Sequence, residues 1–223
     1  MGVLMTSVKI ERSDYFVAFN TSLFLLMCYA VYYDRVVAYR GPANIHEFFL
    51  YAVAIFMTIV TIWVFLRRLS YPVWLLGVIQ LGILLHFAGA FFPIEGGRLY
   101  DAHFLTLRFD KYVHAINAFA GAALAGHLLP AMDGRWRLRL IVIVLATLGG
   151  GAIVEIVEYL VTLTLARNGV GNYDNNMQDL IANLAGALLF ALVWELRSMI
   201  VQSISRRGEK QNSFEEAVLI HSR

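Results

Sequence analysis

The last hydrophobic segment of the chain begins with a run of carboxylate and amide side chains, which are residue types that bind cations and orient polar substrates. The sequence of Tyr173–Gly186 is YDNNMQDLIANLAG, and the chain then stays largely apolar to about Ile200. If a helix begins near the second of the paired asparagines, four residues share one face at spacings of three, four and three: Asn176, Asp179, Asn183 and Gly186. An aspartate at membrane depth costs roughly 2.5–3.5 kcal/mol, so it predicts a partner or a task. We expect Asp174–Asn176 to form the preceding turn and N-cap.

A second polar face begins in the sequence RFDKYVH. Asp110 and His114 are four residues apart, and Asn117 continues the same helical face. A histidine and a carboxylate in this arrangement could bind a metal ion. The alternative is structural: Asp110 caps the helix, Lys111 extends its ammonium group to the membrane surface, and His114 is a hydrogen-bonded core histidine.

Two further acids lie one turn apart in an apolar run. Glu155 and Glu158 share a helical face with Gly151 and Thr162. Close like charges repel each other, so we expect a proton or a bound cation to relieve the repulsion. Alternatively, Glu158 reaches the membrane interface and forms an ion pair with an arginine, either Arg167 or Arg108.

The third hydrophobic segment and the loop after it contribute weaker candidates. His86 shares a face with Gly82 and Gly89 and could bind substrate or serve a structural role. The loop 93–109 contains acidic, basic and histidine side chains and is long for so compact a chain. It could be a lid, an interfacial element or a surface loop without a role.

These candidates support a metal hypothesis. We predict Asp110, His114 and Asp179 as ligands of a divalent cation. Glu155 and Glu158 are the predicted general bases, and three residues are predicted to bind or orient the substrate: Asn183, Asn117 and His86. Mixed histidine and carboxylate donors suit zinc, iron or manganese, whereas carboxylates with amides suit magnesium or calcium. The spacings match no specific metal motif, and neither HExxH nor GxSxG occurs.

The composition predicts that these residues lie in a membrane. Of 223 residues, 59% are hydrophobic and 15% are charged, and the mean hydropathy is +0.64. A soluble domain carries about a quarter charged residues, so the composition indicates a polytopic membrane protein in contact with the lipid bilayer. The net charge of +2 does not favour nucleic acid as a partner. Cys28 is the only cysteine, which excludes an internal disulfide and a multi-cysteine metal site.

The hydrophobic pattern predicts an all-α transmembrane bundle in a single domain, residues 1–202, followed by a polar cytoplasmic tail, 203–223. Six spans of sufficient length are expected at about 16–33, 48–65, 72–92, 112–132, 138–165 and 178–200. The first lacks a small-residue cleavage site and is expected to remain uncleaved. With both termini cytoplasmic, twelve Lys and Arg residues fall on the cytoplasmic side and six on the other. This topology places the polar ends of spans four, five and six on the extracytoplasmic side.

The motifs DKYVH, EIVEY and DNNMQDLIANLAGA resemble those of the bacterial inner-membrane family typified by YjdF and, more distantly, the VanZ-like family linked to glycopeptide-antibiotic tolerance. The resemblance covers about residues 108–190. It implies a multi-pass protein of the bacterial inner membrane, and neither family supplies an established reaction. The positions that it carries over are Asp110, Lys111, His114, Glu155, Glu158, Asp174, Asp179, Asn183 and Gly186. VanZ-like proteins often have glutamine where this chain has Glu158.

Three functions are compatible with the sequence, and whether the protein is an enzyme stays open. The first is a metal-assisted hydrolase or transferase that acts on a lipid-linked or envelope substrate. The second is a proton- or cation-coupled transporter or an ion-binding membrane protein. The third is a purely structural network of polar groups that packs three helices together. The sequence makes no prediction of the oligomeric state.

Overall fold

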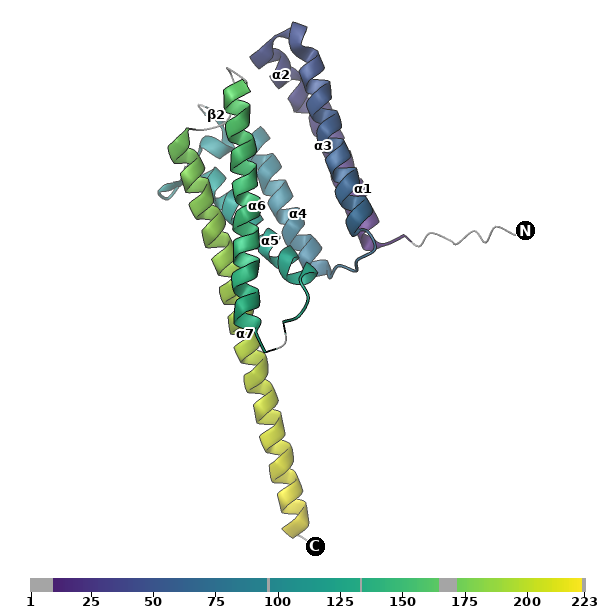
Figure 1. Cartoon of the computed structure of the whole chain (residues 1–223), viewed down its shortest axis with the longest axis vertical. Helices are drawn as coiled ribbons and strands as arrows, with labels where there is room; N and C mark the ends of the chain where they lie inside the picture. The colour runs from purple at the N-terminus through teal and green to yellow at the C-terminus, as the bar shows by residue number, and fades with distance from the viewer. Residues whose placement is uncertain (1–9, 96, 133, 165–171, 222–223) are drawn as a thin grey trace, which may run out of the picture. The chain divides into compact units, whose positions relative to one another are not determined.

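Figure 1 shows the computed structural model of the chain, which describes residues 10–95, 97–132, 134–164 and 172–221. It is built almost entirely of helices, so the predicted all-α class is confirmed. The chain divides into two compact units. The first consists of Met1–Ala102 and Ile156–Asn172, and the second of His103–Glu155 and Tyr173–Arg223.

The first unit contains the N-terminal helices and one short hairpin. Its elements in order are α1 (Arg12–Met27), the π-helical turn η1 (Cys28–Tyr32), α2 (Tyr33–Arg40), η2 (Pro42–Asn44), α3 (Ile45–Leu66), α4 (Val73–Phe91), the antiparallel strands β1 (Pro93–Ile94) and β2 (Gly97–Arg98), and η3 (Leu99–Asp101). The final turns of the long helix α6 also belong to this unit.

Polar side chains join α1 to its neighbours within the first unit. Asp14 accepts hydrogen bonds from the Trp63 indole at 2.7 Å and from the Arg67 guanidinium at 3.3 Å, which ties the start of α1 to the end of α3. Asn20 of α1 and Gln80 of α4 exchange amide hydrogen bonds of 2.8 and 3.2 Å. The Asn20–Gln80 pair satisfies amide groups inside apolar helices, where water is not available to do so.

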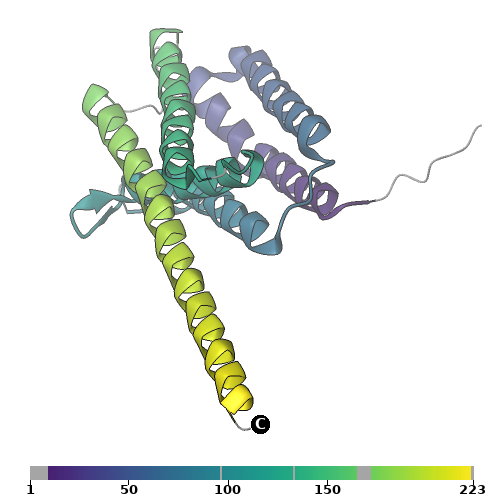
Figure 2. The same cartoon turned by 60° about the horizontal axis from the view of Figure 1, so that its bottom comes forward.

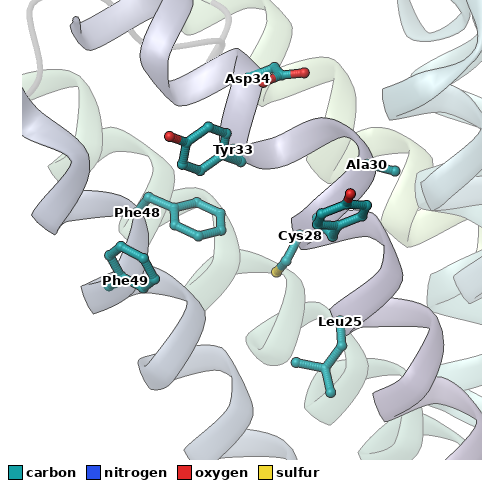
Figure 3. Close-up of a pocket in the computed structure, with 8 residues that line it drawn as sticks. Leu25, Cys28, Ala30, Tyr33, Asp34, Phe48 and Phe49 are labelled. Atoms are coloured by element: carbon teal, nitrogen blue, oxygen red, sulfur yellow. The ribbon is translucent and has the colours of Figure 1, made fainter. Parts of the chain in front are cut away.

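A mostly apolar pocket of about 670 Å³ lies among α1, η1, α2 and α3. Figure 3 shows the rings of Phe48 and Phe49 on one side and the thiol of Cys28 near the centre. Cys28 is buried, as expected for a small apolar side chain inside a helix. None of the residues predicted for the polar site lines this pocket.

The second unit contains the hairpin β3 (His103–Phe104) and β4 (Leu107–Arg108), then α5 (Phe109–Leu128), the main part of α6 (Trp136–Thr164), and α7 (Tyr173–His221). Helices α5 and α7 approach each other closely because Gly186 has no side chain. A Cβ atom at Gly186 would overlap the backbone carbonyl of Ala115. Small residues permit such contacts between membrane helices. Beyond this point, the Phe119 and Phe190 rings pack edge to face, 5.6 Å apart.

Five helical segments in the described part of the chain are long and apolar enough to cross a membrane. They are Arg12–Arg35, Phe48–Leu66, Val73–Ala90, Trp136–Leu160 and Tyr173–Ser205. Each overlaps one of the six predicted spans. The remaining prediction, 112–132, coincides with the 20-residue helix α5, which is not among the five. The end of the fifth predicted span, residue 165, lies outside the described residues. The single-domain organisation and the cytoplasmic location of both termini stay predictions.

The structure corrects the sequence prediction at the start of α7. The helix begins at Tyr173 rather than near Asn176, so the predicted turn and N-cap at Asp174–Asn176 is wrong. A contact between the first two turns favours the earlier start: Asn175 donates from Nδ2 to Asp179 Oδ2 at 2.8 Å. At its other end, α7 continues through the predicted polar tail to His221, and the cytoplasmic location of that tail stays a prediction. Figures 1 and 2 both show α7 as one uninterrupted helix.

Candidate metal centre

Three side chains of metal-binding type converge in the second unit, one from each of its long helices. His114 comes from α5, Glu155 from α6 and Asp179 from α7, and one ligand atom of each lies within 4.8 Å of the others. The imidazole lies between the two carboxylates, with Nε2 at 3.3 Å from Asp179 Oδ1 and Nδ1 at 4.0 Å from Glu155 Oε1. Both carboxylates are buried, whereas the His114 side chain is 25% exposed. We call these three residues the acidic–histidine cluster.

A glycine of α6 lies against a side chain of α7 beside the cluster. Gly151 precedes Glu155 by one turn of α6, and a Cβ atom there would lie 2.6 Å from Nδ2 of Asn183. Asn183 itself is buried and lies one turn after Asp179 on α7. The glycine therefore allows an amide side chain to lie next to the cluster.

Lys111 places a positive charge directly against the cluster. Its side chain is 3% exposed, and Nζ donates to Asp179 Oδ1 at 2.7 Å, to Asn175 Oδ1 at 2.8 Å and to the Asn175 carbonyl at 3.2 Å. Asp110 Oδ2 lies 3.3 Å away on the other side. The structural alternative in which Lys111 extends to the membrane surface is therefore wrong. The buried ammonium group is stable because two carboxylates compensate its charge.

Asp110 belongs to an ion-pair network beside the cluster rather than to the cluster itself. Its carboxylate lies 3.4 Å from the Arg108 guanidinium and 3.3 Å from Lys111. Its other oxygen, Oδ1, is buried and accepts no hydrogen bond from the described residues. Asp110 was predicted as the third ligand, but the three ligand atoms within 4.8 Å of one another belong to His114, Asp179 and Glu155.

Asn175 is the residue that the sequence prediction missed. Its Oδ1 accepts from both Arg108, at 3.0 Å, and Lys111, and its Nδ2 donates to Asp179 Oδ2. It thereby holds the second oxygen of Asp179 while Lys111 holds the first. Hydrogen bonds of this kind orient metal-binding carboxylates. The i, i+4 spacing from Asn175 to Asp179 was the available signal, and the misplaced helix start concealed it.

Three other predicted site residues, Asn117, Glu158 and His86, are not among the three residues of the cluster. Asn117 is half-buried on α5. Glu158 is half-buried on the part of α6 that belongs to the first unit, and Arg167, one of its suggested partners, lies outside the described residues. His86 also belongs to the first unit, where its Nδ1 lies 2.5 Å from the hydroxyl of Tyr100. Glu158 and His86 therefore belong to a different unit from the three residues of the cluster.

The chemistry of the cluster is that of a compact, partly accessible cation site. One imidazole and two carboxylates are a donor set that suits zinc, manganese or iron, and three protein ligands leave a coordination position for water or substrate. With ionised carboxylates, Asp110, Glu155 and Asp179 contribute three negative charges against the two positive charges of Lys111 and Arg108. The remaining negative charge favours a cation over an anion next to His114.

Helices of membrane-spanning length combined with a buried polar cluster define a polytopic membrane protein with an internal polar site. The chain belongs to a family of predicted membrane proteins, DUF2238, whose model matches residues 19–199. This match covers the cluster and its supporting residues. No curated protein and no solved structure matches the chain.

Proposed function

We propose that the protein is a metal-dependent membrane enzyme, a hydrolase or transferase that acts on a lipid-linked or envelope substrate. A divalent cation would be bound by His114, Glu155 and Asp179. The single observation that carries this proposal is the convergence of their ligand atoms within 4.8 Å of one another. The sequence predicted Glu155 as a general base and Asp110 as a ligand. We now propose Glu155 as a ligand, with Asp110 supporting the site through Lys111.

The surroundings of the cluster support this chemistry. A cation with an open coordination position activates water or polarises a phosphoryl or carbonyl oxygen. Lys111 and Asn175 hold Asp179 in place, so the carboxylate would need little reorganisation to bind the metal. Asn183 and Asn117, which belong to the same unit as the cluster, are proposed to bind or orient substrate. The roles of Glu158 as general base and of His86 in substrate binding stay predictions from the sequence.

A location in the bacterial inner membrane, with the site on the extracytoplasmic side, is part of the proposal. It is supported by the bias of twelve Lys and Arg residues against six across the predicted topology. The resemblance to the family typified by YjdF, and more distantly to VanZ-like proteins, supports the same location. A substrate that is attached to a lipid would reach the cluster without leaving the bilayer.

Metal analysis of the purified protein tests the proposal. Protein stripped with a chelator in detergent is equilibrated with Zn²⁺ or Mn²⁺, desalted and analysed by mass spectrometry for bound metal. We expect about one ion per chain, and a loss of at least tenfold in affinity for His114→Ala and Asp179→Asn. His103→Ala is the matched control, because this histidine is exposed in the same unit. Two results together would refute the proposal: the native protein holds no stoichiometric metal, and the Glu155→Gln and Asp179→Asn variants keep the function of the protein in the cell envelope.

A proton relay is the second candidate, and the position of the His114 ring between two carboxylates favours it. An imidazole can accept a proton on one nitrogen and release one from the other. In proteoliposomes, the relay predicts proton or cation flux that His114→Gln abolishes. If the protein is a metal-dependent enzyme, we expect metal binding without proton or cation flux. If the network is only structural, neutral substitutions lower thermal stability and leave both metal content and flux unaffected.

A further inference from the structure

The hairpin formed by β3 and β4 exposes apolar side chains outside the candidate membrane spans. Leu105 at its tip is 96% exposed, and Phe104 and Leu107 beside it are 47% and 48% exposed. Loop tips that face water are normally polar. Three neighbouring apolar residues at a tip therefore point to an apolar environment.

The backbone of Leu105 strengthens this inference. Phe104 pairs with Leu107, so Leu105 is the first residue of a two-residue loop, and its φ angle is +56°. Glycine is favoured at such a position because a side chain is strained in the left-handed region. The chain instead carries a large apolar side chain that makes almost no contact with its own protein. A binding partner for this side chain would account for both features.

The depth of the hairpin follows from its attachment to α5 and α7. Arg108 at the end of β4 donates from Nη1 to Asn175 Oδ1 at 3.0 Å, and Asn175 is the third residue of the candidate span Tyr173–Ser205. The base of the hairpin therefore lies where that span begins. Tyr112 donates to the Phe104 carbonyl at 2.9 Å, which fixes the hairpin against the first turn of α5. The base of the hairpin thus lies near one end of a candidate membrane-crossing helix, where the membrane interface is expected.

We propose that the tip of the β3–β4 hairpin, formed by Phe104, Leu105 and Leu107, inserts into the interface of the lipid bilayer. The partner is the lipid surface itself, because the base of the apolar hairpin is hydrogen-bonded to the third residue of a candidate membrane span. A cationic residue at the base is compatible with this partner, since the Arg108 side chain is 31% exposed. This inference goes beyond the proposed function and does not depend on metal binding.

Site-directed spin labelling tests the insertion directly. Because Cys28 is the only cysteine, Cys28→Ala gives a background in which Leu105→Cys carries a single nitroxide. The protein is reconstituted in nanodiscs of phosphatidylethanolamine and phosphatidylglycerol. Power saturation then compares collisions with oxygen, which concentrates in lipid, with collisions with a water-soluble nickel chelate. His103→Cys, at the base of the same hairpin, is the matched control.

We expect the label at 105 to collide several-fold more with oxygen than with the chelate, relative to the label at 103. Leu107→Cys provides a second labelled position near the tip and should behave as Leu105→Cys does. Equal, water-like accessibility at 105 and 103 would overturn the proposal. Dipolar broadening at 105 that disappears on dilution with unlabelled protein would also overturn it, because a second copy of the chain would then cover the tip.

Discussion

Replacing Lys111 by methionine removes the central positive charge of the polar network. The ammonium group is 3% exposed and lies 2.7 Å from Asp179 and 3.3 Å from Asp110, so its loss leaves two buried carboxylates without their shared counter-ion. Breaking a buried ion pair from one side costs about 3–5 kcal/mol. For a chain of this size each kcal/mol corresponds to about 2–4 °C, so the midpoint of thermal unfolding should fall by about 6–20 °C.

Thermal unfolding in detergent, followed by circular dichroism, measures this loss. Arg197→Met is the control: it removes an exposed positive charge from α7 and should change stability by less than about 0.5 kcal/mol. The double variant Lys111→Met with Asp179→Asn removes both charges of the shortest contact and leaves Asp110 beside Arg108. We therefore expect it to be more stable than Lys111→Met alone. Saturating Mn²⁺ should stabilise Lys111→Met more than the native protein, because the cation replaces the lost charge.

Two results would refute this reasoning. If Lys111→Met unfolds within about 2 °C of the native protein, the ammonium group does not compensate buried carboxylates. If the double variant is less stable than the single one, Lys111 and Asp179 do not act as a pair. Either result would remove the network that supports the acidic–histidine cluster.

Glycine contacts and the strained loop provide three further predictions. Gly186→Ala should lower the free energy of unfolding by about 1–3 kcal/mol because its Cβ meets the backbone of α5. Gly150→Ala has open space around it and should raise that free energy by about 0.5–1 kcal/mol. Thermal unfolding of both variants checks this pair. Gly151→Ala should displace Asn183 and weaken metal binding about tenfold, and unchanged affinity in a metal titration would contradict it. Leu105→Gly should raise stability in detergent by about 1 kcal/mol by relieving a left-handed backbone; a lower unfolding midpoint would be the opposite result.

The helical class and the polar helix faces could be predicted from the sequence because both depend on local patterns. Apolar length gives the spans, and the four-residue spacing of Asp110 and His114 gives a shared face. The partners across helices could not be predicted in this way. Burial of Lys111 is favourable only because Asp179, 68 residues later, lies within 2.7 Å of it. Local sequence carries no signal for such a contact.

The sequence predicted Asp110 rather than Glu155 as a ligand for a similar reason. Asp110 lies one helical turn before His114 on α5, whereas Glu155 lies on α6. Only the position of α6 brings the Glu155 carboxylate to the imidazole. His86 belongs to the first unit and the cluster to the second, so its role in substrate binding stays a prediction.

The continuity of α7 has a consequence for the outer dimensions of the protein. At about 1.5 Å per residue, its 49 residues form a rod about 74 Å long, more than twice the roughly 30 Å of a hydrocarbon core. The surplus length means that α7 extends beyond the hydrocarbon core. The signal of a fluorescent or enzymatic reporter fused after His221 would identify the compartment that receives the C-terminus.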